Sequence, residues 1–192
     1  MNSSITFAGI AAATLSAFLG ASAVRADDAT VTTRLIGYQE TPATINSAAS
    51  GEFTAKIHPD GTAIDYELSY RELSSAVLQA HIHFGRPGLS GGVVLFLCTN
   101  LTPPSGVPTP QACPAPPATV TGTLTAIDVI AIPGQGIDSG TTGFAEILTA
   151  IRAGAAYANV HTANHPGGEI RGRLGGDGRQ HEGQEHAGHD AH

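Results

Sequence analysis

Short runs rich in Val, Ile and Thr recur along the chain and are separated by Gly, Pro, Asn or Asp. This pattern is typical of all-β domains, because β-branched residues fit the pleated surface of a strand and the other residues interrupt it. The strands that we predict are Thr30–Tyr38, Gly51–His58, Ala63–Tyr70, Val77–Phe84, Gly92–Cys98, Thr119–Ala126, Ala155–Thr162 and Glu169–Leu174. Between the second and third strands, Pro59-Asp60-Gly61 predicts a hairpin turn, since Pro presets φ and Gly accepts a positive φ.

One segment departs from the strand pattern. Over Gly143 to Ala153 the apolar residues follow helical spacing, at Phe144, Ile147, Leu148 and Ile151. Gly154 stands where a C-terminal helix cap is expected. We therefore predict an all-β fold, an antiparallel two-sheet sandwich or flattened barrel, with one short helix packed across its open end.

Size and charge narrow the function classes. The chain has 192 residues and a formal net charge of −7 with histidine counted as neutral. This acidic balance argues against a nucleic-acid partner. The length suits one domain with a full hydrophobic core plus tails.

The amino-terminal segment has the composition of a leader. An apolar run covers Ile5–Val24, and Arg25 is the only charged side chain among residues 1–26. We predict a signal peptide over residues 1–26, cleaved after Ala26 because two aspartates follow, with cleavage after Ala23 as the alternative. An uncleaved membrane anchor is less favoured, since Ser, Thr and Gly interrupt the apolar run. The mature chain is expected to be secreted or periplasmic, without stable membrane insertion.

The carboxyl-terminal segment has a different composition. Residues 175–192 show no apolar periodicity, so we predict that this tail is disordered. Acidic residues in the tail are interleaved with four histidines, His181, His186, His189 and His192. Such a composition can capture divalent ions weakly, and the alternative is a solvated polar tail without a role in binding.

The chain has two cysteines, Cys98 and Cys113. In an oxidising compartment we expect them to form a disulfide. The bridge would close a Pro-rich loop of roughly 15 residues and contribute on the order of 3 kcal/mol by restricting the unfolded chain. A pair of thiolate metal ligands is the alternative, which the Pro-rich spacer and the lack of a nearby histidine disfavour.

Histidines supply the candidate chemistry. His81 and His83 are two residues apart in a predicted strand, so their side chains leave the same face with backbones roughly 7 Å apart. His161 lies in a second strand with a similar sequence. Three converging imidazoles form a neutral ligand set that suits copper or zinc and leaves a fourth position for water or substrate. Under this hypothesis His81, His83 and His161 are the metal ligands.

A structural role for the same residues is the alternative. The three histidines and Asn159 would then form a buried polar network that fixes strand register, with Thr162, Glu169 and Arg171 as partners. In the metal hypothesis, Asn159, Glu169 and Arg171 instead support the ligands from behind. If the neighbours of Glu169 lie across from the histidine strand, its carboxylate can accept a hydrogen bond from an imidazole N–H and orient that ring.

Three motifs follow one another along the chain: Glu-Thr-Pro at 40–42, Ala-His-Ile-His with a downstream Gly at 80–85, and Asn-Val-His-Thr followed by Pro-Gly-Gly-Glu-Ile-Arg-Gly at 159–172. In this order they resemble the CHRD domain, the module first recognised in chordin and also found in many bacterial secreted proteins. The resemblance runs from about Thr30 to Leu174, and we assign residues 27–174 to this domain. It implies a secreted module to which no catalytic activity is attached.

A weaker resemblance is to the copper half of copper/zinc superoxide dismutases, which also use a β-sandwich. It implies copper ligation by the three histidines and an anion-guiding role for Arg171. The sequence departs from that family because it has no evident bridging histidine and no zinc-loop set of ligands. We therefore do not infer dismutase activity from it.

The sequence thus favours a secreted, non-catalytic CHRD-domain protein that binds copper or zinc through a three-histidine site. One alternative is an extracellular protein-interaction or matrix module with a structural histidine network and an extracellular protein as partner. The second alternative is a superoxide-dismutase-like redox enzyme.

Overall fold

The fold consists of eight strands and one helix, as the predicted all-β class requires. The computed structural model describes residues 29–103 and 105–176. Its strands are β1 (Ala29–Ile36), β2 (Ser50–Ile57), β3 (Ala63–Arg71), β4 (Val77–Phe84), β5 (Gly92–Thr99), β6 (Ala118–Thr125), β7 (Ala156–Thr162) and β8 (Ile170–Leu174). The helix is α1 (Gly140–Arg152), and three short 3-10 turns are η1 (Gly37–Gln39), η2 (Ala126–Asp128) and η3 (Pro133–Gln135).

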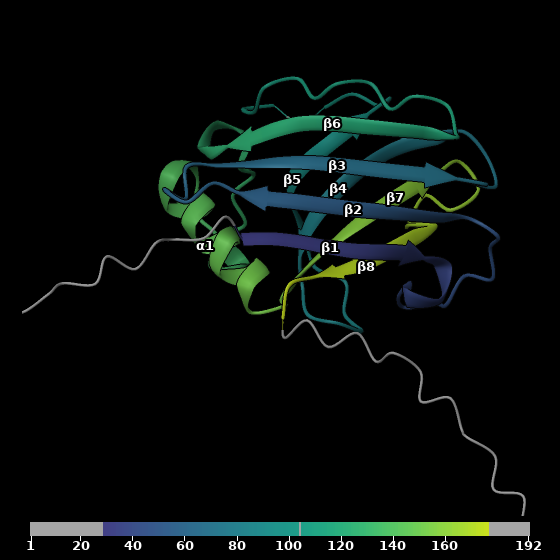
Figure 1. The fold of residues 1–192 in the computed structure, drawn as a ribbon, viewed down its shortest axis with the longest axis horizontal. Helices are drawn as coiled ribbons and strands as arrows, with labels where there is room; N and C mark the ends of the chain where they lie inside the picture. Colours follow the sequence, from purple (N-terminus) through teal and green to yellow (C-terminus); the bar gives the residue numbers. More distant parts are fainter. Residues whose placement is uncertain (1–28, 104, 177–192) are drawn as a thin grey trace, which may run out of the picture.

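All eight strands form one antiparallel sheet in the order β5-β4-β7-β8-β1-β2-β3-β6. The sheet curls until its two edge strands, β5 and β6, contact each other without pairing (Figure 1). Across this seam the Tyr66 hydroxyl of β3 donates to the carbonyl oxygen of Leu97 in β5 at 2.6 Å. The architecture is therefore a nearly closed barrel, which confirms the flattened-barrel form of the prediction.

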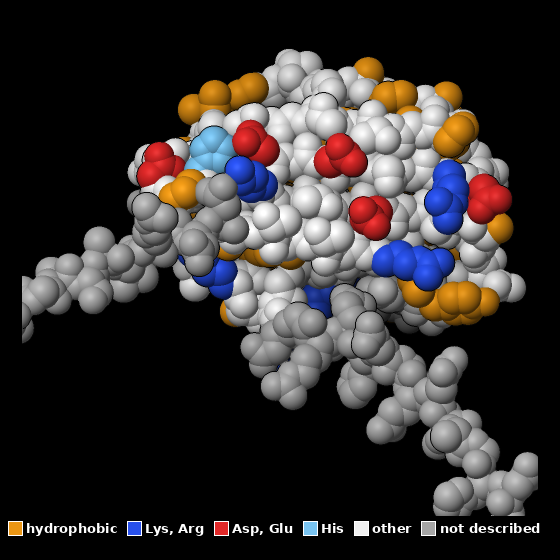
Figure 2. Space-filling view, in the orientation of Figure 1, with side chains coloured by type: hydrophobic (Ala, Val, Ile, Leu, Met, Phe, Trp, Pro, Cys, Tyr) orange, Lys and Arg blue, Asp and Glu red, His pale blue; other side chains and the backbone are white. Residues whose placement is uncertain are grey.

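Alternation along the strands separates the core from the surface. Inward-facing side chains such as Phe53, Leu68 and Val160 are fully buried and belong to one continuous hydrophobic cluster. Their neighbours on β2 and β3, including Glu52 and Glu67, are exposed. Figure 2 shows this outer face, where acidic and basic side chains are scattered among neutral ones. The predicted turn between β2 and β3 is present, with Gly61 at a φ of 68°.

The helix closes one end of the barrel, at the left of Figure 1. It begins at Gly140 rather than at the predicted Gly143, and it buries the four predicted apolar side chains Phe144, Ile147, Leu148 and Ile151. Gly154 follows the helix with a φ of 67°, as expected of a cap. No helix in the described part of the chain has both the length and the apolar character needed to cross a membrane.

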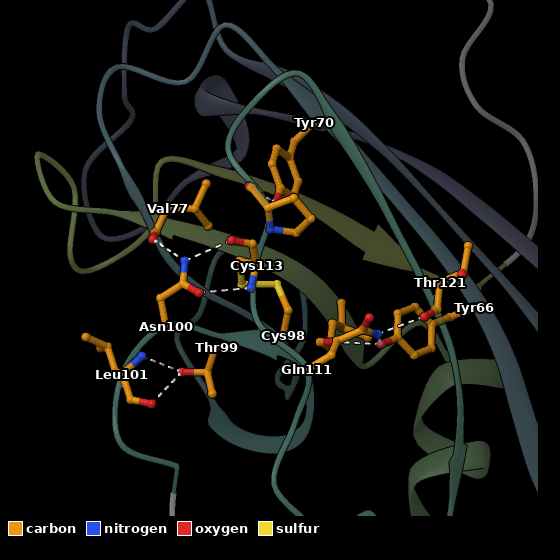
Figure 3. Close-up of a disulfide and its surroundings, with 12 residues drawn as sticks. Tyr66, Tyr70, Val77, Cys98, Thr99, Asn100, Leu101, Gln111, Cys113 and Thr121 are labelled. Atoms are coloured by element: carbon orange, nitrogen blue, oxygen red, sulfur yellow. Dashed lines mark hydrogen bonds between the residues drawn. A yellow bond between two sulfur atoms is a disulfide. The ribbon is translucent and has the colours of Figure 1, made fainter.

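A Pro-rich segment between β5 and β6 covers the seam (Figure 3). It is fixed to β5 by a disulfide between Cys98 and Cys113, whose Cα atoms are 5.0 Å apart. Gln111 then contacts both sides of the seam, because its backbone carbonyl oxygen accepts from the Thr99 N–H of β5 at 2.9 Å and its side-chain amide donates to the Tyr66 hydroxyl of β3 at 2.9 Å and to the Thr121 carbonyl of β6 at 2.7 Å. The predicted pairing of the cysteines is thus present in the structure, next to the strand that carries His81 and His83.

Candidate metal centre

The three candidate ligands lie on the outer face of the barrel wall. Ile82 in β4 and Val160 in β7 point into the hydrophobic core. Since side chains alternate along a strand, His81, His83 and His161 point to the opposite side of the sheet. β4 and β7 are paired antiparallel, and this pairing brings residues 80 positions apart in sequence onto adjacent strands.

This outer face is nevertheless buried. The relative exposure is 1% for His81, 8% for His83 and 6% for His161. Hydrogen bonds bring three loops over it, formed by residues 37–49, 85–91 and 163–169. The histidines therefore lie between the barrel wall and a cover of loops, outside the hydrophobic core.

The three imidazoles converge. The ring centroid of His81 is 5.3 Å from that of His83 and 4.8 Å from that of His161. The centroids of His83 and His161 are 5.9 Å apart. One nitrogen of each ring lies within 4.8 Å of the corresponding nitrogens of the other two. The structure thus brings together all three residues that the sequence proposed as ligands.

Backbone carbonyls fix the orientation of two of these rings. Nδ1 of His83 is 3.0 Å from the carbonyl oxygen of Gly91, and Nδ1 of His161 is 2.9 Å from that of Pro166. A carbonyl only accepts, so each Nδ1 carries the proton and each Nε2 keeps its lone pair. This is the arrangement that orients metal-binding histidines in proteins.

The remaining imidazole nitrogens have no hydrogen-bond partner among the described residues. They are Nε2 of His83, Nε2 of His161 and both nitrogens of His81. Buried polar atoms in proteins are nearly always paired, because an unpaired one loses its hydration without compensation. Several unpaired nitrogens facing a common point fit a transition metal, which accepts lone pairs from neutral imidazoles.

Burial keeps these histidines neutral. It lowers the pKa of His81 to about 2 and the pKa of His83 to about 4, and it also lowers the pKa of His161. Desolvation is the largest cause in each case, and the neighbouring imidazoles add to it for His81. At neutral pH the lone pairs are therefore available for coordination rather than protonated.

Aromatic rings pack around the cluster. Phe96 of β5 meets His81 edge to face, with centroids 4.5 Å apart. Tyr157 stacks on His83 at 4.7 Å with an interplanar angle of 4°. The Tyr157 hydroxyl also accepts a hydrogen bond from the backbone N–H of Gly91 at 3.1 Å. Tyr157 and the Gly91 backbone together hold His83 by stacking and by its Nδ1.

Two charged residues, Glu40 and Arg171, lie next to the cluster and hold the covering loops in place. Nδ2 of Asn159 donates to Oε1 of Glu40 at 2.7 Å, and Nε of Arg171 lies 3.8 Å from Oε2 of the same carboxylate. Burial raises the pKa of Glu40 to about 7, although Arg171 and Asn159 pull it downward. Arg171 donates to Thr41 and, at 3.2 Å, to the carbonyl of Leu89, so it links two of the covering loops.

Glu169 has a different place from the one expected. It accepts hydrogen bonds from the hydroxyls of Ser47 at 2.6 Å and Thr162 at 2.7 Å, and from the Ser74 hydroxyl and backbone N–H, both at 2.9 Å. Burial alone would raise the pKa of Glu169, but these bonds outweigh it and the pKa is lowered. Among the described residues its partners include no imidazole, so Glu169 anchors loops instead of orienting a ligand.

The two other histidines in the described part of the chain, His58 and His165, do not belong to the cluster. His58 contacts Asp65 on the exposed side of the β2–β3 turn, with 2.8 Å between Nε2 and Oδ2. His165 is half-buried in the loop before β8, where its backbone closes the turn. The four tail histidines, at 181, 186, 189 and 192, lie outside the described residues, as do residues 1–26.

Sequence reasoning gave no role to Glu40 or Tyr157. Glu40 belongs to the Glu-Thr-Pro motif, which was the available signal that this residue matters. Tyr157 is two residues before Asn159 in a strand whose seven residues are all buried. A tyrosine on the polar side of such a strand indicates a covered outer face.

A nearly closed antiparallel barrel with a buried cluster of three neutral histidines defines a β-module with a candidate transition-metal centre. The CHRD domain family model matches residues 31–174. The chain therefore belongs to the CHRD domain family. Searches of curated proteins and of solved structures each gave no match.

Proposed function

We propose that this CHRD domain binds one transition-metal ion, copper or zinc, through His81, His83 and His161, and that it does so as a secreted or periplasmic, non-catalytic protein. The observation that carries the proposal is the set of buried imidazole nitrogens without hydrogen-bond partners. The ligands would be Nε2 of His83, Nε2 of His161 and one nitrogen of His81.

The donor set supports copper or zinc rather than a harder ion. Neutral imidazoles suit copper and zinc, whereas calcium and magnesium prefer several oxygen ligands. The carboxylate of Glu40 faces Asn159 and Arg171 and is not in the cluster. The low exposure of all three histidines supports a holding role over turnover of a substrate.

Hydrogen bonding also argues against a purely structural histidine network. A buried network stabilises a fold when its members satisfy one another, and it costs stability when they do not. Within the described residues, both nitrogens of His81 lack such a partner. A metal ion would engage the lone pairs that this arrangement leaves unused.

Export of the protein is part of the same proposal. The disulfide between Cys98 and Cys113 is compatible with an oxidising compartment. The predicted signal peptide over residues 1–26 would direct the chain there.

The test uses the full chain with its four tail histidines replaced by glutamine, so that the tail does not compete with the cluster for metal. After loading with Zn(II) or Cu(II) and removal of free ions, elemental analysis should find one ion per chain. His83→Ala should lower this occupancy by at least about tenfold, because one of three ligands is lost. Absorption-edge spectroscopy should report nitrogen ligation.

The matched control is His58→Ala, which removes an imidazole from the exposed turn. It should bind metal as the parent chain does. Equal occupancy in His83→Ala and its parent, or loss of metal in both histidine variants alike, would contradict the proposal.

A further inference from the structure

A second site lies beside the cluster, on the other side of Tyr157. A pocket of about 300 Å³ is bounded by η1, the 85–91 loop, β7 and β8. We call it the arginine pocket because its lining includes Arg86, Arg171 and Arg173, with Glu40 as its one acidic residue. Three of the nine Lys and Arg residues of an acidic chain thus meet in one small cavity.

The positive charge of this pocket is not neutralised from within. The Arg86 side chain has no partner in the described part of the chain, and it is exposed at the pocket. Arg173 donates from Nε to the carbonyl oxygen of Gly154 at 3.1 Å, which is a neutral acceptor. Nε of Arg171 is buried without a hydrogen-bond partner, its nearest acid being Glu40 at 3.8 Å.

The one carboxylate cannot balance three guanidinium groups. Glu40 already accepts a hydrogen bond from Asn159 and pairs with Arg171 alone. A concave site with low-dielectric walls and a net positive charge concentrates anions from solution. Guanidinium groups match a planar carboxylate well, since two parallel N–H donors can meet its two oxygens.

Part of the remaining lining is apolar and is formed by Pro87, Ala156 and the ring of Tyr157. The rest of the lining is Gly88 and the polar residues Tyr38, Gln39 and Thr41. β7 lies between β4 and β8, so the ring of Tyr157 stands between His83, which stacks on it, and Arg171, whose guanidinium carbon lies 3.7 Å from the ring centroid. A ligand in the arginine pocket would therefore contact Tyr157 and the arginines, and the tyrosine would separate it from the histidines.

We propose that the arginine pocket binds a small organic carboxylate that carries a flat apolar body. Its carboxylate lies against Arg86 and Arg173 at the pocket mouth and reaches toward the unpaired Nε of Arg171. Its apolar body packs on Pro87 and Tyr157. This site is distinct from the histidine cluster, so the inference holds whether or not the cluster binds metal.

Benzoate is the probe, because it joins a carboxylate to a flat ring. Calorimetric titration of the full chain, stripped of metal by a chelator and then dialysed free of that chelator, should show binding of one benzoate, weakening as ionic strength rises. Benzyl alcohol keeps the ring without the charge, and inorganic phosphate keeps an anion without the ring. Both should bind at least about tenfold more weakly than benzoate.

Arg86→Glu tests the site itself, because this exposed side chain can be replaced without loss of an internal contact. It should lower benzoate affinity by at least about tenfold and leave the melting temperature unchanged. The matched control is Arg34→Glu, since Arg34 lines a separate hollow over β1, β2 and β3. This control should bind benzoate as the native chain does.

Three results would overturn the proposal. One is the absence of benzoate binding to the native chain, and another is equal affinity in native protein and Arg86→Glu. The third is binding of benzyl alcohol or phosphate as tight as that of benzoate. Since the titration uses metal-free protein, none of these results depends on the occupancy of the histidine cluster.

Discussion

The outward-facing side chains of the barrel follow the same strand alternation everywhere, but on one part of the wall they are exposed to water and on another part they are buried. On β2, β3 and β6 the outward residues, such as Glu67 and Thr121, are exposed (Figure 2). On β7 all seven residues are buried, including the outward-facing Asn159 and His161. The alternation decides which side chains point away from the core, and the loops decide whether those side chains meet water.

The outer face of β4 and β7 could have been left exposed to water, and burying its polar residues costs free energy. The loops at 37–49, 85–91 and 163–169 recover part of that cost through hydrogen bonds to Glu169, Arg171 and the Nδ1 atoms of His83 and His161. The nitrogens that point toward the centre of the cluster receive no such compensation within the described residues. In the same part of the chain, Asn159 Oδ1 and Arg171 Nε are also buried without a hydrogen-bond partner, so the feature that distinguishes the histidine cluster is the convergence of its unpaired nitrogens.

The largest expected effect concerns the pH dependence of the metal-free protein. Burial lowers the pKa of His81 from 6.5 to about 2 and that of His83 to about 4, so below pH 6.5 the unfolded chain binds protons that the folded chain excludes. The histidine contribution is fully present above pH 6.5 and is lost as the pH falls, by about 2 kcal/mol for each of the two histidines at pH 5. Glu40, whose pKa burial raises to about 7, opposes part of this loss, and it does so in the native chain and in a His83 variant alike.

Urea unfolding in chelator between pH 5 and pH 8 measures this dependence. In His83→Asn one of the two groups is absent, so the fall in stability should be shallower than in the native chain. An identical slope in the two proteins would show that His83 is not held neutral by burial.

The next largest effect is expected from the anchor of the covering loops. Glu169→Ala should destabilise the protein by about 3 kcal/mol, because the donors on Ser47, Ser74 and Thr162 lose their acceptor in a buried place. Glu67→Ala on the open face should change stability by less than about 0.5 kcal/mol. Chemical denaturation measures the free energy of unfolding of both variants. Equal losses of stability would contradict the expected difference between the covered and the exposed face.

A smaller effect should follow from Gly91→Ala in the 85–91 loop. A Cβ at this position would collide with the carbonyl oxygen of Phe84, so the loop must shift and the acceptor of His83 Nδ1 moves with it. We expect a loss of about 2 kcal/mol together with reduced metal occupancy.

Gly88→Ala is the control in the same loop, because its Cβ would meet open space and only its φ of 80° is unfavourable. It should cost about 1 kcal/mol and leave metal occupancy unchanged. Equal metal loss in the two variants would mean that the close approach of Gly91 has no part in holding His83.

The smallest effect is expected from single hydroxyl groups on the two faces. Tyr157→Phe removes the acceptor of the Gly91 N–H and should cost about 1 kcal/mol. Thr54→Val removes an exposed hydroxyl that contacts Thr32, and it should cost less than about 0.5 kcal/mol. Thermal melting resolves this difference, and a larger loss in Thr54→Val would reverse the ranking of the faces.

Much of the fold was predictable because it depends on local patterns. The β2–β3 turn follows from Pro59 and Gly61, and the buried face of α1 follows from the spacing of Phe144 and Ile151. The start of α1 was predicted three residues late, since Gly140, Thr141 and Thr142 are weak helix formers. The choice between two sheets and one barrel depends on contacts between β5 and β6, which no local pattern encodes.

The candidate site was predictable in part for a similar reason. A spacing of two residues places His81 and His83 on one face, whatever the tertiary structure. The contact between Glu40 and Asn159 joins residues 119 positions apart, so periodicity could not reveal it. Glu169 was predicted to start the last strand, whereas β8 begins one residue later and Glu169 ends the preceding loop; its partners Ser47 and Ser74 come from loops whose paths the sequence does not predict.

Placement of the histidines outside the hydrophobic core has a consequence for protein engineering. If the two proposed sites bind their ligands, substitutions in the loops at 37–49, 85–91 and 163–169 would alter which ion or small molecule the domain accepts, while the interior that specifies the barrel remains as it was. Loop exchange on an unchanged wall is therefore a route to new chemistry in this domain.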